Sequence, residues 1–183
     1  MDTVQAKQQN QFAALSLQTL TEEQKVTVNH LVSTLQADFT DSQYASFSTL
    51  FLAQQQVQDN QLEAARASLQ WVLNQGPTAE IKAMASIRLA RVILSESSEN
   101  GQKALDLVMS LNTGKSYQAT VESVKGDAFL ALGDREKATQ AYQEAVSVAR
   151  ETGQNRPLLQ LKLDDLASMA PVISKQKASE QEG

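Results

Sequence analysis

The chain has 183 residues, enough for one compact domain, and its composition of abundant Ala, Leu, Gln and Glu with only 3 Pro and 7 Gly favours helix throughout. The absence of Cys excludes disulfides, thiolate metal sites and cysteine nucleophiles. A formal net charge of -5 argues against nucleic acid or anionic lipid as a partner, because both require clustered Lys and Arg.

Helical periodicity and capping residues predict an all-α protein. Thr21 and Gln24 match a capping box, and Gly76 followed by Pro77 marks a helix end. The tail 175–183 is polar, and we expect it to be disordered. In chain order, the helices are expected at about 3–19, 22–37, 43–58, 61–75, 78–95, 102–112, 117–132, 135–151 and 157–169.

Membrane-spanning and export signals are missing from the printed sequence. No apolar run approaches the ~20 residues that cross a bilayer, and residues 1–10 have no signal-peptide core. We therefore expect the chain to behave as a soluble domain, whereas the sequence leaves open whether Met1 is the natural start.

Residues 122–148 carry the offsets of a tetratricopeptide helix-turn-helix unit. Two antiparallel helices that pack closely need small residues where their backbones cross and bulky residues beside them. Gly133 can end the first helix in the left-handed conformation, and Asp134 can cap the second. The small residues are Gly126, Ala138 and Ala145, and the bulky ones are Phe129 and Tyr142.

Internal repetition extends this unit to three helical hairpins. Ala53, Ala90 and Gly126 occupy the same small position in three first helices, 37 and 36 residues apart, and Ala65, Ala104 and Ala138 mark the second helices. The surplus over 34 residues falls in the loop 97–101. The prediction is a right-handed superhelix in one domain, 1–174, with hairpins 43–75, 78–112 and 117–151, an N-terminal helical pair 3–37 and a C-terminal capping helix 157–169.

Three stretches of the sequence carry a more specific pattern in their order and spacing. They are Leu52-Ala53-Gln54-Gln55 with Leu62-Glu63-Ala64-Ala65, then Ile87-Arg88-Leu89-Ala90-Arg91-Val92, then Gly126-Asp127-Ala128-Phe129-Leu130-Ala131-Leu132-Gly133-Asp134. Together they resemble the periplasmic domain of the YfgM family, the ancillary subunits of the bacterial SecYEG translocon. The likeness runs from about Tyr44 to Ala167.

The resemblance implies a non-enzymatic role at the periplasmic face of the bacterial inner membrane. Members of the family have a single transmembrane anchor, which this chain lacks, so the resemblance implies a soluble fragment that begins just beyond the membrane. The implied partners are the SecYEG translocon, the membrane-anchored periplasmic folding factor PpiD and emerging polypeptide clients. No catalytic residue, cofactor or metal comes with the resemblance.

Tetratricopeptide geometry places a set of first-helix residues on the concave face, where they would form a groove that binds polypeptide. The groove is mainly apolar with two guanidinium groups, and it lacks the Lys and Asn arrangement that clamps an acidic carboxyl terminus. An alternative, equally weighted, is that the terminal helices fill it and bury these residues as core. The predicted groove residues are Phe47, Leu50, Phe51, Gln54, Val57, Met84, Ile87, Arg88, Arg91, Leu94, Val124, Asp127 and Leu130.

Other polar and aromatic residues are interpreted as structural. His30 has no Cys or paired carboxylate at ligand spacing, and Trp71 lies on a helix with other apolar residues, which favours the core. Asp164 and Asp165 are adjacent and point about 100° apart on a helix, which disfavours a shared-proton pair and favours solvated surface charges.

Two further function classes stay open in the sequence. The same array could be a cytoplasmic scaffold that assembles regulatory or enzymatic partners, and a gene that encodes a transmembrane helix directly upstream of Asp2 would discriminate against it. An enzyme would need a site assembled from scattered Glu, Asp and Arg, and no pair of these stands out by its spacing.

Overall fold

The computed structural model describes residues 20–168, and these residues fold entirely as helices and short connections. The predicted helix 3–19 and the predicted tail 175–183 lie outside the described residues. The helices are α2 (Glu22–Asp38), α3 (Gln43–Gln58), α4 (Leu62–Gln75), α5 (Ala79–Glu96), the 3-10 helix η1 (Ser98–Asn100), α6 (Gly101–Met109), α7 (Lys115–Ala131), α8 (Arg135–Glu151) and α9 (Pro157–Ser168).

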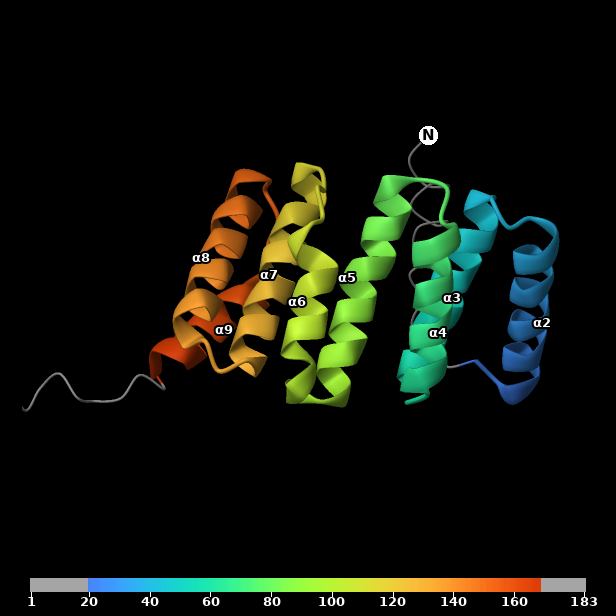
Figure 1. The fold of residues 1–183 in the computed structure, drawn as a ribbon, viewed down its shortest axis with the longest axis horizontal. Helices are drawn as coiled ribbons and strands as arrows, with labels where there is room; N and C mark the ends of the chain where they lie inside the picture. The colour runs from blue at the N-terminus through green and yellow to red at the C-terminus, as the bar shows by residue number, and fades with distance from the viewer. Residues whose placement is uncertain (1–19, 169–183) are drawn as a thin grey trace, which may run out of the picture.

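From α2 to α8 the helices stand side by side in chain order and form a stack, and α9 lies against its α7–α8 end (Figure 1). Each of them contacts the next one along the chain, and α5 also contacts both α3 and α7. This second set of contacts joins helices that lie two apart in the chain, as expected when successive hairpins stack with their first helices on one side. The predicted all-α, tetratricopeptide-like fold class is confirmed.

Local capping chemistry sets several helix ends where the sequence predicted them. The Thr21 hydroxyl accepts from the Gln24 backbone N–H at 3.3 Å, and the Gln24 side chain accepts from the Thr21 N–H at 2.9 Å. Asp134 caps α8 by accepting from the Lys137 N–H at 3.1 Å. Gly133 has a φ of 79°, the left-handed conformation that favours glycine.

Two predicted boundaries differ from the structure. Helix α6 ends at Met109 rather than near residue 112, and the Leu111 N–H bonds the Val108 carbonyl in a tight turn. The residues that follow, Asn112-Thr113-Gly114, have low helix propensity and do not extend the helix. The predicted loop 97–101 is mostly the 3-10 turn η1, in which the Ser97 hydroxyl accepts from the Glu99 N–H at 3.2 Å.

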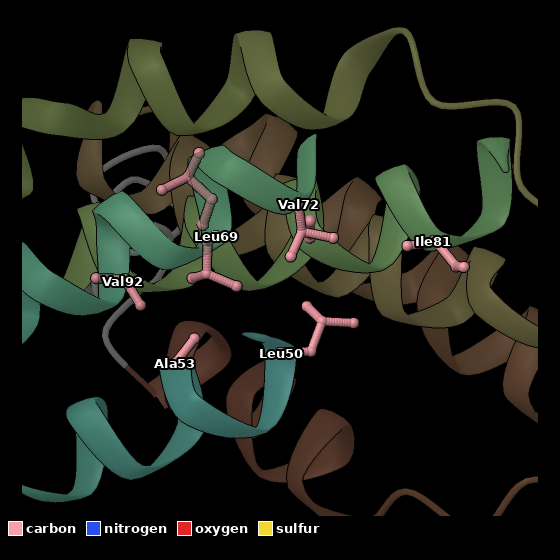
Figure 2. Close-up of a cluster of buried hydrophobic side chains, with 8 residues drawn as sticks. Leu50, Ala53, Leu69, Val72, Ile81 and Val92 are labelled. Carbon is pink, nitrogen blue, oxygen red and sulfur yellow. The ribbon is translucent and has the colours of Figure 1, made fainter. Parts of the chain in front are cut away.

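The predicted small positions are all buried between helices. Where α7 crosses α8, a Cβ placed on Gly126 would lie only 2.4 Å from the Tyr142 ring, so the close approach of these two helices requires glycine. Between α3, α4 and α5, Leu50 and Ala53 face Leu69, Val72 and Val92 in one apolar cluster (Figure 2). The buried small residues are Ala53, Ala65, Ala90, Ala104, Gly126, Ala138 and Ala145.

Residues 20–168 contain no helix that is both long and apolar enough to cross a bilayer.

Candidate functional site

An open pocket of about 340 Å³ lies where α3, α4 and α5 meet, and we call it the α3–α5 pocket. Its walls come mainly from the first helices of the first two hairpins, and one residue comes from α4. Two of the lining residues are arginines, and we call the part of the pocket that they line its mouth. The lining residues are Ala53, Gln54, Val57, Gln58, Leu69, Arg88, Arg91 and Val92.

The apolar part of the pocket is an extension of the core between the first two hairpins. Leu69 is only 1% exposed and belongs to the same cluster as Ala53 and Val92. Figure 2 shows Ala53 of α3 pointing toward these two residues. Ala53 is almost fully buried, whereas Val57, one turn further along α3, is 42% exposed. The pocket therefore offers apolar surface that an apolar side chain could cover.

Arg88 connects the two sides of the pocket. Its Nη1 donates to the Leu50 carbonyl oxygen at 3.2 Å, which joins α5 to α3. Burial lowers the pKa of Arg88, and Tyr117 acts in the opposite direction. Since a guanidinium stays protonated in proteins, the result is a half-buried positive charge with further N–H donors.

Arg91 lies in a cluster of charges that reaches the third hairpin. Part of the Arg91 side chain is exposed to solvent. The burial of the rest lowers the pKa of Arg91. Asp127 opposes this shift, and Arg156 and Arg88 add to it. Arg156 precedes α9, and its Nε donates to the Gln154 side-chain oxygen at 2.7 Å. The charges that act on Arg91 therefore come from α5 itself, from α7 and from the segment that precedes α9.

The structure brings only part of the predicted groove together. The pocket contains Gln54, Val57, Arg88 and Arg91 from that set. Leu50, Ile87 and Val124 do not line an open groove, because neighbouring helices bury them in the core. Of the remaining predicted residues, Met84 and Leu94 are partly buried against core clusters, Phe51 is half-buried, and Phe47 and Leu130 are exposed.

Several residues of the site were missed from the sequence. Leu69 was not among the predicted groove residues, although its side chain forms part of the pocket wall. Ala53 was taken only as a spacer between helices. Arg156 acts on the charge of Arg91 without lining the pocket. It follows Arg91 in the chain only after α6, α7 and α8, and no local pattern connects the two residues. Only the stacking of the hairpins in three dimensions brings these residues together.

The third hairpin is partly covered by α9. Leu159 packs with Ala145 and Val148, and Leu166 packs with Tyr142. The Arg135 guanidinium donates to the Leu166 carbonyl at 3.1 Å. The alternative in which residues 157–169 bury part of the predicted groove therefore describes the third hairpin, whereas the α3–α5 pocket is lined by none of them.

A polar network fixes this contact of α9 with the third hairpin. The Tyr142 hydroxyl donates to Asp127 at 2.5 Å, and Lys162 of α9 forms an ion pair with the same carboxylate. The Lys162 ammonium also lies 5.3 Å from the centre of the Tyr142 ring. Asp127 is thus occupied by partners within the domain rather than offered to a ligand.

This network predicts that the domain becomes less stable at alkaline pH. Burial and the hydrogen bond to Asp127 raise the pKa of Tyr142 above its usual value near 10. Above about pH 10 the unfolded chain releases this proton while the folded chain keeps it, so the free energy of unfolding falls by up to about 1.4 kcal/mol per pH unit. Denaturant titrations of the wild type and Tyr142→Phe from about pH 9 to 11 should show a steeper fall in the wild type. If the free energy of unfolding fell equally with pH in both proteins, the raised pKa of Tyr142 would be contradicted.

The other singled-out residues lie away from the pocket. His30 is exposed, and residues 20–168 contain no cluster of ligands that could hold a metal ion. Trp71 packs against the same apolar cluster as Leu69, consistent with a core role. Asp164 and Asp165 are exposed, and Asp164 accepts from Gln160 at 3.0 Å.

Comparison with protein families agrees with the stack of hairpins. The tetratricopeptide repeat-like domain family matches residues 2–168. The chain belongs to this family. No solved structure gives a significant match to this tetratricopeptide repeat-like domain.

Curated relatives of this tetratricopeptide repeat-like chain are named ancillary SecYEG translocon subunits. The Escherichia coli (strain K12) protein is 32% identical over 125 residues, which cover 68% of this chain and 58% of the relative. The Neisseria gonorrhoeae protein is 28% identical over 167 residues, covering 88% of this chain and 78% of the relative. The resemblance that the sequence motifs indicated is confirmed, although the chain matches less than two thirds of the E. coli relative's length.

Proposed function

We propose that this chain is a non-enzymatic protein-interaction domain that works beside the SecYEG translocon and binds polypeptide in the α3–α5 pocket. The relatives' names supply the association with the translocon. The pocket supplies the binding chemistry, and it is the observation that carries the proposal: apolar walls open to solvent, with two arginines at the mouth.

The finer parts of the proposal rest on the family resemblance. They are a position at the periplasmic face of the inner membrane, a membrane anchor outside this sequence, contact with the folding factor PpiD, and a chaperone link for emerging polypeptides. The open pocket between the first two hairpins supports the binding part of this proposal.

The pocket fits one side chain of a polypeptide better than a large ligand. Its volume of about 340 Å³ is at the small end of known ligand pockets. An apolar side chain would cover Ala53, Val57 and Val92, while Arg91 could donate to a backbone carbonyl or a carboxylate beside it. Because so little surface is desolvated, binding should be modest and clients should be released readily.

Site-specific crosslinking in membranes tests this function. A photoreactive amino acid at Gln54, which lines the pocket, should crosslink to translocon subunits or to a polypeptide in transit when the domain is joined to its natural membrane anchor. The matched control is the same replacement at Gln70, which is exposed on α4 and does not line the pocket. Strong products from position 54 and weak ones from position 70 are expected.

Equal crosslinking from both positions would mean that the pocket has no special role. Crosslinks from position 70 alone would mean that the binding surface lies outside the pocket. Either result would contradict the proposed function.

A further inference from the structure

The mouth of the α3–α5 pocket carries positive charge that the described part of the domain does not neutralise. Neither Arg88 nor Arg91 has a carboxylate within ion-pair distance among residues 20–168. The nearest acidic influence on Arg91 is Asp127, and this carboxylate already forms an ion pair with Lys162. Arg156 adds a further positive charge that acts on Arg91.

The positive charge at the pocket is opposite in sign to the net charge of the whole chain. The sequence carries a formal net charge of -5, so a cationic mouth on one apolar pocket is a local exception. Positive charges without a paired carboxylate attract acidic segments of polypeptide and repel basic ones. A basic segment would have to bring its lysines or arginines next to Arg88 and Arg91, at a cost that an acidic segment avoids.

We infer that the α3–α5 pocket selects extended, acidic stretches of polypeptide, in which one bulky apolar side chain enters the pocket and carboxylates within a few residues of it pair with Arg88 and Arg91. The inference rests on the proposed function and specifies its ligand class. The carboxylates are internal side chains rather than a chain terminus, and guanidinium groups donate paired N–H groups to their oxygens.

The dimensions agree with this arrangement. Arg91 and Arg88 line the same pocket as Val57 and Val92, so an apolar anchor and a bound carboxylate lie close together. An extended chain advances ~3.3 Å per residue. A glutamate about one to three residues from the anchor can therefore reach the guanidinium groups while the anchor stays in place.

Peptide binding to the folded chain tests the inference. The probes are a short peptide with one leucine flanked by glutamates, both ends blocked, and a counterpart in which glutamine replaces every glutamate. By fluorescence anisotropy, the acidic peptide should bind at least about tenfold more tightly at low salt, and the difference should shrink as salt screens the charges. Arg91→Gln should remove most of this preference. Lys103→Gln, on α6 outside the pocket, is the matched control and should leave it intact.

The outcomes separate the inference from the proposed function. Equal binding of the two peptides, an unaltered preference in Arg91→Gln, or no binding of the acidic peptide would overturn the inference. A preference that appears only when the peptide has a free carboxyl terminus would also overturn it. Val57→Asp tests the pocket itself, because a carboxylate among the apolar walls should weaken both peptides. Peptides that bind Val57→Asp unchanged would count against the proposed function instead.

Discussion

Replacing Gly126 by alanine should lower the free energy of unfolding by about 2 kcal/mol, even though alanine is the better helix former. The added Cβ would lie 2.4–2.9 Å from three atoms of the Tyr142 ring. The ring cannot easily move away, because it is 1% exposed and its hydroxyl is bonded to Asp127. The strain should exceed the gain of ~1 kcal/mol in helix propensity. Chemical denaturation measures the change, and the melting temperature should fall by about 4–8 °C.

Gly114→Ala is the control for this substitution. A Cβ there meets nothing within 4 Å, so only its N-terminal cap position is affected, at a cost below about 1 kcal/mol. The double variant Gly126→Ala with Tyr142→Leu should be less destabilised than the sum of the two single variants, because the ring is then gone. Additive effects, or a more stable Gly126→Ala protein, would show that α7 and α8 do not depend on this contact.

Leu69→Ala should destabilise the domain by about 2–5 kcal/mol, because Leu69 is buried in the cluster that joins α3, α4 and α5. Its side chain also lies beneath the α3–α5 pocket, so the deletion would merge a new cavity with that pocket rather than leave it sealed. Urea titration followed by far-UV circular dichroism measures the loss. Leu69→Met, which roughly conserves the volume, should cost less than about 1.5 kcal/mol.

Leu158→Ala gives the same chemical change at a position on α9 that is 69% exposed. It should alter the free energy of unfolding by no more than about 0.5 kcal/mol. If Leu69→Ala and Leu158→Ala had equal effects, the buried cluster between the first two hairpins would not contribute as the structure indicates.

The fold was predictable because its determinants are local and repeated. Small residues at matching offsets, a capping box at Thr21 and a Gly133-Asp134 turn each specify a short-range geometry, and the structure shows them in that geometry. The ends of α6 and the turn η1 were not predictable to the residue, because helix propensity changes gradually over Ser110–Gly114 and the polar stretch before α6 could form either a loop or a 3-10 turn.

The site was predictable only in part. Arg88 and Arg91 were identified because first-helix positions in a tetratricopeptide hairpin share one face, and both line the pocket. Leu50, Ile87 and Val124 were assigned to the same face, but the depth to which a neighbouring helix covers each one depends on how the hairpins stack. A sequence period gives the direction of a side chain and not its distance from the next helix.

The sequence by itself determined that this chain is helical, that its helices pair into hairpins and which family it resembles, because spacing, capping and small residues act within or between neighbouring segments. Only the tertiary structure decided where the stack stays open. The α3–α5 pocket lies where α3, α4 and α5 meet, while α9 covers the third hairpin through Leu159, Leu166 and the ion pair of Lys162 with Asp127. These contacts join residues far apart in the chain, and their outcome depends on packing in three dimensions.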